Sequence, residues 1–229
     1  MNTVDDIFSL HNEIVYSGKT SYSGLIWFPG CDIGFCPDPQ RHSSYSDEYF
    51  RKFEEYDRTE MGSKITSHRV ATVDLYWTGS VIDIGCGTGA FVKLRKHDTK
   101  GYDVSSYGAR VLSSIRRYVN PYNHEVECDA LSFWDSLEHI IDPRPLLWRV
   151  KKYVFMTIPI CKDAKHAIEY KHWKPKEHYW HFTHIGLLGF MDSFGFTCKH
   201  FSSEECLLGR EDVGTYVFEK TNPGVWFHP

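Results

Sequence analysis

The segment Val81–Phe91, VIDIGCGTGAF, places three glycines at alternate positions directly after a short apolar run. A sharp turn from a strand into a helix needs residues that tolerate a positive φ angle and lack a Cβ atom, and Gly85, Gly87 and Gly89 meet both needs. In an open parallel sheet such a turn lies where ligands bind, beyond the carboxyl end of a strand. The segment therefore predicts bare backbone close to a ligand, with the free amide groups of the following helix aimed at it.

The glycine segment opens a regular alternation of predicted strands and helices. Apolar strand patterns occupy residues 80–85, 99–104, 130–134 and 153–160, and helix patterns follow the first three at 89–97, 106–118 and 143–152. Such alternation implies a parallel sheet that is covered by helices on both faces. After a helix at 185–194, strand patterns at 196–202 and 214–220 suit a final antiparallel hairpin at one sheet edge. The predicted fold class is α/β, with a Rossmann-like, mostly parallel sheet and an antiparallel last strand.

The beginning of the chain has a different composition. Residues 1–45 are rich in Gly, Pro, Ser and aromatic residues, which predicts an irregular arm or lid. Ser46 then offers an N-cap for a helix over residues 47–56, and a second helix is predicted over 64–77. We expect an arm with cap helices over residues 1–75, the ligand-binding domain over 76–222 and a tail over 223–229.

Charge and cysteine content restrict the partners and the compartment. The net charge of −4 argues against a mainly electrostatic grip on nucleic acid. Seven cysteines without regular spacing, Cys31 and Cys36 among them, argue against a disulfide framework and fit a reducing cytoplasm. The N-terminus is acidic and polar, and no apolar run approaches the roughly 20 residues that span a bilayer. We therefore expect a cytoplasmic protein with no membrane partner.

Three interpretations of the glycine turn compete. A phosphate-binding loop requires a Lys and a Ser or Thr after the last glycine, but Ala90 and Phe91 follow Gly89. A dinucleotide-binding turn requires G-x-G-x-x-G, whereas the pattern is G-x-G-x-G. The third is the D-x-G-x-G-x-G turn of class I S-adenosylmethionine (SAM)-dependent methyltransferases, which DIGCGTG resembles closely. Asp83, the acid of this motif, is expected to accept hydrogen bonds from the turn or, through water, from a bound ammonium group.

A second acidic residue supports the third interpretation. Asp103 ends the next predicted strand, about 20 residues after the turn, where a carboxylate can accept hydrogen bonds from both hydroxyls of a ribose. With both motifs, the chain is similar to class I SAM-dependent methyltransferases from Ser46 to Lys220. Within that group it is most similar to the branch of ubiquinone-type O-methyltransferases and sugar methyltransferases. The resemblance is carried by VIDIGCGTGAF, GYDVSSYGA, CDALSFWDSLEHIIDP and HYWHFTHIGLLGFMDSFGF.

The resemblance implies the fold, the cofactor and its site. It implies a seven-stranded sheet with a reversed last strand, SAM as methyl donor, S-adenosylhomocysteine (SAH) as product, and N-terminal helices that cap the substrate. It implies a cofactor site that consists of Asp83, Gly85, Cys86, Gly87, Gly89, Asp103, Val104, Phe133 and Trp134. Arg69 can reach the carboxylate of the cofactor or form an ion pair. The usual third strand has no clear match; RRYVN is its nearest equivalent, with Asn120 as a substitute contact.

A carboxylate and histidine motif follows the fourth strand, in FWDSLEHIID. On a helical turn the spacing of Asp135, Glu138 and His139 puts them on one face, where they can bind a divalent cation or act as an acid/base pair. Some relatives carry E-x-x-E-H here and hold a metal, and the resemblance implies His178 as a further ligand, with His181 as the second choice. Other relatives keep the motif without metal, so the alternative is that Glu138 and His139 orient the substrate.

The predicted function is SAM-dependent methylation of an oxygen on a small molecule, a sugar or a modified nucleotide. His139 is the expected general base, and Glu138 and Asp135 are expected to face the acceptor. The segment 161–184, rich in histidine and aromatic residues, is predicted to be a loop of the substrate pocket. WDSL after the fourth strand excludes an amino-methylating DNA enzyme, which requires [DN]-P-P-[YF] there. The alternatives are a metal-assisted RNA 2'-O-methyltransferase and a non-catalytic SAM-binding or partner protein.

Overall fold

The structure is a computed structural model, and it describes residues 20–22, 24–37 and 46–221. The described strands are β1 (Thr20–Tyr22), β2 (Leu25–Phe28), β3 (Ile33–Phe35), β4 (Val81–Ile84), β5 (Thr99–Tyr102), β6 (Ala130–Trp134), β7 (Tyr153–Cys161), β8 (Trp180–Thr183), β9 (Phe196–Ser202) and β10 (Val213–Lys220). The described helices are α2 (Asp47–Asp57), α3 (Glu60–Tyr76), α4 (Ala90–Leu94), α5 (Ser106–Ser114), η1 (Leu137–His139), α6 (Arg144–Leu147), α7 (Ala164–Glu169), α8 (His184–Ser193) and α9 (Glu204–Leu207).

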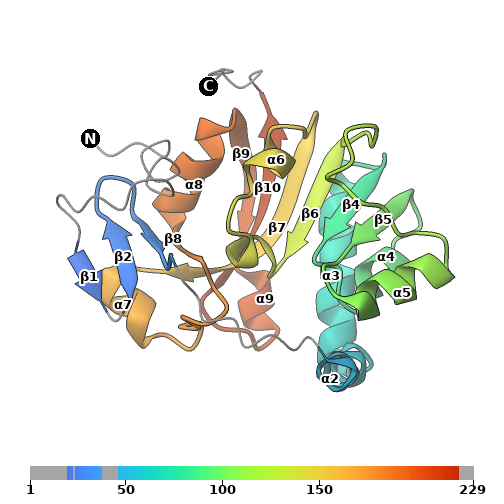
Figure 1. The fold of residues 1–229 in the computed structure, drawn as a ribbon, viewed down its shortest axis with the longest axis horizontal. Helices are drawn as coiled ribbons and strands as arrows, with labels where there is room; N and C mark the ends of the chain where they lie inside the picture. The colour runs from blue at the N-terminus through green and yellow to red at the C-terminus, as the bar shows by residue number, and fades with distance from the viewer. Residues whose placement is uncertain (1–19, 23, 38–45, 222–229) are drawn as a thin grey trace.

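The central sheet confirms the predicted Rossmann-like arrangement. Strand β4 pairs in parallel with β5 on one side and β6 on the other, and β6 pairs in parallel with β7. Strand β10 runs antiparallel between β7 and β9, as the pattern at the end of the sequence predicts. The carboxyl ends of β4, β5, β6 and β7 therefore meet at one edge of the sheet, which is where the glycine turn lies (Figure 1).

The expected third strand is reduced to a single bridge. Gly101 of β5 forms an isolated parallel bridge with Tyr118, and the amide of Val119 donates to the Gly101 carbonyl over 3.1 Å. The side chain of Asn120 accepts a hydrogen bond from the Tyr122 amide at 3.0 Å, which closes a local turn. The segment RRYVN thus occupies the position of the missing strand, but only one residue pair of the ladder forms.

The N-terminal arm and the 161–184 segment are more regular than predicted. Strands β1, β2 and β3 form an antiparallel meander, and β3 pairs with β8, which in turn pairs in parallel with the end of β7 (Figure 1). The predicted irregular arm and loop are wrong here, because each segment supplies the pairing partner that the other lacks. The expectations for residues 1–19, 38–45 and 223–229 lie outside the described residues.

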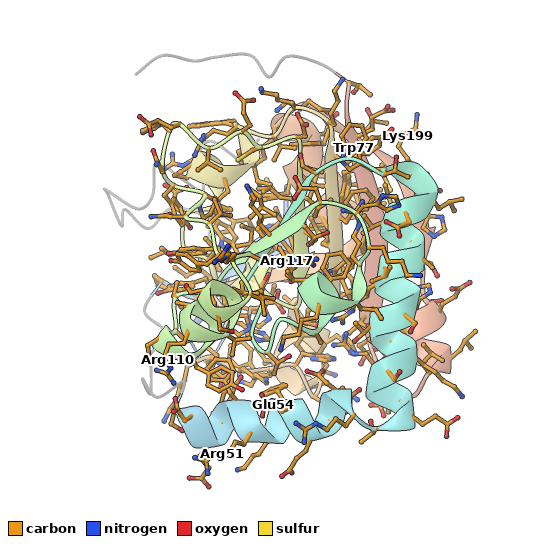
Figure 2. All side chains as sticks on the ribbon, turned by 90° about the vertical axis from the view of Figure 1, so that its right-hand side faces the viewer. Arg51, Glu54, Trp77, Arg110, Arg117 and Lys199 are labelled. Carbon is orange, nitrogen blue, oxygen red and sulfur yellow. The ribbon has the colours of Figure 1, made fainter. Side chains whose placement is uncertain are left out.

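The two predicted cap helices are present. The Ser46 side chain accepts from the Tyr49 amide at 3.2 Å and starts α2, as predicted. Helix α3 begins four residues earlier than predicted, because the Thr59 hydroxyl caps it by accepting from the Gly62 amide. Figure 2 shows α2 lying across the end of the domain below α5, while α3 runs along its side. None of the described helices combines the length and the apolar character that a membrane span requires.

The core lies on both faces of the central sheet. On one face β4, β6 and β7 pack against α6 and α8, with Phe133, Leu147 and Phe190 among the fully enclosed side chains. On the other face Val73 of α3 and Leu112 of α5 pack against the sheet. Because side chains alternate along a strand, neighbouring residues of β6 belong to opposite faces. This alternation separates Phe133 from Trp134.

Candidate functional site

The glycine turn after β4 has the predicted backbone. Gly85, Gly87 and Gly89 have φ angles of +73°, +52° and +73°, all in the left-handed region that glycine favours. A Cβ atom on Gly85 would lie 2.6 Å from the Cβ atom of Ser136, so this position also requires glycine for space. The helix that follows, α4, is only five residues long, so its dipole adds less to ligand binding than the sequence suggests.

Asp103 lies beside the glycine turn, at the end of β5. The Gly87 amide donates a hydrogen bond to the Oδ2 atom of Asp103, and the Ser105 amide donates one to its Oδ1 atom. Both donor–acceptor distances are 2.8 Å. Each carboxylate oxygen has a second acceptor site, so the group can still bind ribose hydroxyls. The next residue, Val104, is 76% exposed.

Asp83 is buried below the turn in β4. Its Oδ1 atom accepts a hydrogen bond from the Ser132 hydroxyl of β6 at 2.8 Å. The neighbouring strand, and not the turn, supplies this donor, while the expected contact with a bound ammonium group through water stays a prediction. Burial raises the pKa of the Asp83 carboxyl to about 7. Cys86, in the turn, is also buried, and burial raises the pKa of its thiol.

Phe133 and Trp134 occupy different environments at the end of β6. Phe133 is fully enclosed by the core that includes α6 and α8. Trp134 faces α3 and α4, with the Arg69 guanidinium 5.2 Å from its ring centre and Phe91 at 5.3 Å between ring centroids. The buried Trp134 Nε1 atom has no hydrogen-bond partner among the described residues. Of the two, Trp134 therefore has an unused polar group to offer a ligand.

Helix α2 lies over the glycine turn. The Phe50 ring stacks on Tyr107 of α5, with centroids 4.5 Å apart and an interplanar angle of 1°, and a Cβ atom on Gly87 would lie 3.9 Å from Phe50. Polar contacts hold α2 in this place, namely those of Glu54 with Tyr107, Asp47 with Arg110, and Asp57 with Thr88. Figure 2 shows Arg110 and Glu54 between α5 and α2. The first cap helix thus covers the glycine turn, whereas the resemblance implies a cap over the substrate.

A second group of polar side chains lies just beyond β6. Glu138, His139 and His178, which we term the carboxylate–histidine cluster, each offer a ligand atom, and these atoms lie within 4.8 Å of one another. The two imidazole rings meet edge to face, with centroids 4.5 Å apart. Glu138 Oε2, His139 Nδ1 and His178 Nδ1 are buried and have no hydrogen-bond partner among the described residues. Because buried polar atoms are normally paired, this cluster fits a bound cation or a polar ligand.

Two hydrogen bonds from β8 and the residue before it bring the cluster together. The Tyr179 amide donates to the Glu138 carbonyl at 2.8 Å, and the Trp180 indole donates to the Ile140 carbonyl at 2.8 Å. These bonds join η1 to the start of β8, and His178 directly precedes them. The implied role of His178 as a companion of Glu138 and His139 therefore has a structural basis in the pairing of β8.

Asp135 does not belong to this cluster, although the sequence places it on the same predicted face. The segment is a single 3-10 turn that starts after Asp135, and Asp135 has a φ angle of +55°. Its carboxylate is bonded to Arg210 and Arg69 at 2.7–2.9 Å. Burial would raise its pKa, but the two guanidinium groups hold the pKa well below its usual value. Sequence reasoning missed Arg210 and its neighbour Glu205, which no motif marks.

Of the three groups in the cluster, the two neutral imidazoles suit metal binding as they are, whereas Glu138 has to lose its proton to become a ligand. Burial, followed by the nearby Asp135 carboxylate, raises the pKa of Glu138 to about 8. Burial lowers the pKa of His139, and burial together with the His139 ring lowers the pKa of His178. Neutral imidazoles with a carboxylate are a donor set for zinc and similar divalent cations. A metal would be held by Glu138, His139 and His178.

His181, the second choice of ligand, is buried in β8 outside the cluster. Its Nδ1 atom is 3.0 Å from the Tyr170 hydroxyl, and its ring centre is 5.9 Å from that of His178. Burial lowers the pKa of His181 to about 4, so the imidazole is neutral near pH 7.

The sheet order, the glycine turn and the acid at the end of β5 together define a class I, SAM-dependent methyltransferase domain. The sequence profile of the Methyltransferase domain family matches residues 40–200, and the chain belongs to this family. Its methyl donor is therefore S-adenosyl-L-methionine, and the bare backbone of the glycine turn and the acceptor sites left on Asp103 suit that cofactor. No curated protein matches the chain in sequence.

Several solved structures share the fold at low sequence identity. Magnesium protoporphyrin IX methyltransferase from Synechocystis PCC 6803, with bound SAH, is 11% identical with a TM-score of 0.56; the match covers 77% of this chain and 96% of that one. A SAM-dependent methyltransferase from Archaeoglobus fulgidus is 17% identical, with a TM-score of 0.55 and coverages of 75% and 100%. A chain from the complex of the Haloferax volcanii Trm112 methyltransferase activator with a methyltransferase is 14% identical, with a TM-score of 0.57 and coverages of 77% and 95%.

Proposed function

We propose that the chain transfers the methyl group of SAM to a hydroxyl oxygen of a small molecule, a sugar or a modified nucleotide. The observation that carries this proposal is the carboxylate–histidine cluster, in which three buried polar atoms within one small volume lack hydrogen-bond partners in the described part of the chain. The cluster follows β6 directly and so belongs to the same sheet edge as the glycine turn. An acceptor bound between the two would have its oxygen close to groups that can hold and remove a proton.

The cofactor would be bound by the crevice residues. The backbone of Gly85, Cys86, Gly87 and Gly89 would face the methionine end of SAM. The Asp103 carboxylate would accept hydrogen bonds from the ribose hydroxyls. Val104 would cover the adenine, and Asp83 and Trp134 would line the crevice from below. Transfer from a sulfonium requires in-line placement of the acceptor oxygen, so positioning supplies much of the rate enhancement.

His139 is the proposed general base. Its imidazole is neutral because burial lowers its pKa, and its Nδ1 atom has no partner among the described residues. It can therefore take the proton of an acceptor hydroxyl. Glu138, whose pKa is raised to about 8, is largely protonated near pH 7 and can donate a hydrogen bond to the acceptor.

A divalent cation is an alternative use of the same atoms. Bound to Glu138, His139 and His178, it would act as a Lewis acid that favours the deprotonated form of the acceptor. An RNA 2'-hydroxyl is the acceptor that this second version favours, although the net charge of −4 does not indicate a nucleic-acid partner.

The seven free cysteines fit a reducing compartment such as the cytoplasm.

The proposal is tested by binding and by transfer. Isothermal titration of the protein with SAM and with SAH should show binding of both, whereas a non-catalytic partner protein that has lost the site should bind neither. Transfer from tritiated SAM is then measured with pooled hydroxylated small molecules and with RNA, with and without a chelator. We expect label in small molecules, and a strong loss in His139→Gln but not in His124→Gln, a control at an exposed histidine. Label in RNA that a chelator abolishes would favour the second version.

A further inference from the structure

Four charged side chains form a largely buried network next to the candidate site. Arg69 of α3, Asp135 after β6, Glu205 of α9 and Arg210 before β10 make up this set, which we term the ionic cluster. Arg210 binds Asp135 through two parallel bonds, Nη2 to Oδ1 at 2.7 Å and Nη1 to Oδ2 at 2.9 Å. Arg69 adds a third bond, from Nη2 to Asp135 Oδ2, at 2.8 Å. Both carboxylate oxygens of Asp135 are therefore bonded to guanidinium groups.

Glu205 joins the two arginines from the other side. Arg69 binds its carboxylate at 2.8 Å and 3.0 Å, and Arg210 binds it at 2.6 Å. Glu205 is completely buried and also accepts from the Thr157 hydroxyl at 2.9 Å. Two cations and two anions balance, which a largely buried network requires, because an unpaired charge at such a place is strongly destabilising.

The backbone at Asp135 bends where the network holds its side chain. Its φ angle of +55° is in the left-handed region, which Asp adopts more readily than most residues with a side chain but which still depends on support from the surroundings. The Asp135 amide donates to the Thr157 carbonyl at 2.8 Å, and the Ser136 hydroxyl donates to the Ile84 carbonyl at 2.6 Å. The 3-10 turn with Glu138 and His139 follows immediately, so its direction depends on how this bend is held.

We propose that Asp135, Arg210 and Arg69 are positioning residues, which fix the bend after β6 and thereby aim Glu138 and His139 at the acceptor. This inference rests on the proposed function, and it replaces the expected role of Asp135 as an acid, base or metal ligand. Arg210 reaches the site from the β9–β10 connection and Arg69 from α3, so segments distant in sequence set the geometry of the acceptor site.

Asp135→Asn, Arg210→Met and the double variant test the proposal. Asparagine tolerates the left-handed backbone, so the first variant removes the charge and one of the two acceptor oxygens without adding strain at this position. The readout is side-chain NMR of isotope-labelled His139 and His178, compared with wild type at one pH. Arg144→Met is the matched control, because it removes another two-bond arginine–aspartate pair, with Asp142, at a partly exposed site. Thermal melts establish that each variant folds, and Arg210→Lys, which keeps the charge without the planar fork, replaces Arg210→Met if that variant does not fold.

We expect both single variants to move the same two histidine signals by similar amounts, the double variant to move them no further, and the control to leave them in place. A different result would overturn the proposal: the signals move in Asp135→Asn but stay at their wild-type positions in Arg210→Met. Asp135 would then act directly and not through its ion pair with Arg210. Unchanged signals in all variants would overturn it as well. Titration of the wild-type protein with SAH separates the two claims, because absent binding contradicts the proposed function and leaves the NMR comparison valid.

Discussion

The amide of Gly87 donates a hydrogen bond to the Oδ2 atom of Asp103 at a distance of 2.8 Å, so the glycine turn and the end of β5 are held as one unit. The Ser105 amide holds the other oxygen at the same distance. The acid that we expect to bind the ribose therefore also shapes the turn that we expect to face the methionine end. A change at Asp103 should affect both ends of the cofactor site.

We expect Asp103→Asn to weaken SAH binding by about 10- to 100-fold, because a charged acceptor of several hydrogen bonds becomes a neutral one. Asp103→Ala should weaken it further and lower the melting temperature, because the Gly87 amide loses its partner. Isothermal titration and thermal melts measure the two effects. Asp98→Asn, at an exposed acid before β5, is the control. Equal SAH affinity in Asp103→Asn and wild type would show that this acid does not bind the cofactor.

Gly85→Ala should destabilise the protein by about 2–4 kcal/mol, from a left-handed backbone and from contact with Ser136. The added Cβ atom would lie 2.6 Å from the Cβ atom of Ser136. Gly24→Ala is a matched control, because Gly24 has a φ angle of +91° but no atom of the described residues within 4 Å of an added Cβ. The control should therefore show the cost of the backbone alone, about 1 kcal/mol. Chemical denaturation measures both, and equal losses would contradict the steric part of the argument.

Local sequence patterns were sufficient for the central sheet and the glycine turn. The φ angles of Gly85, Gly87 and Gly89 follow from the need to turn a buried strand sharply into a helix, and that need is visible within one short segment. The position of Asp103 follows from the next strand, because parallel strands end at the same edge. These are requirements of neighbouring residues on one another, so a single sequence contains them.

Features that depend on distant partners could not be predicted in this way. The pairing of Ile33 with Phe182 makes strands of two segments that look irregular by themselves. The bonds from Arg210 to Asp135 join the end of the chain to its middle, and no spacing rule connects them. The hydroxyl of Ser132 reaches Asp83 from the neighbouring strand, where the sequence suggested the turn. In each case the partner is chosen by tertiary packing.

Added zinc should stabilise the protein if the carboxylate–histidine cluster binds metal. A ligand at about 100 times its dissociation constant stabilises a folded protein by about 2.7 kcal/mol, which is several degrees for a chain of this size. The shift should be lost in His178→Gln and kept in His124→Gln, and a chelator should reverse it. Differential scanning calorimetry with and without zinc gives the measurement. A shift that survives in His178→Gln would place the metal elsewhere.

The pH dependence of stability should identify Glu138 in the metal-free protein. Burial raises its pKa in the folded state from the ordinary 4.5 to about 8, so between these pH values the folded state binds more protons than the unfolded state. The contribution of this residue to stability therefore falls as the pH rises through that interval. Glu138→Gln removes the titration, so the variant should match wild type near pH 5 and exceed it near pH 9 by several kcal/mol. Melting curves in the presence of a chelator at the two pH values measure the difference.

Glu125→Gln, at an exposed glutamate, is the control for this measurement and should show no such trend. A constant difference between Glu138→Gln and wild type across this range would mean that the Glu138 carboxylate is already ionised near pH 5 in the folded protein, and would remove its proposed role as a hydrogen-bond donor to the acceptor.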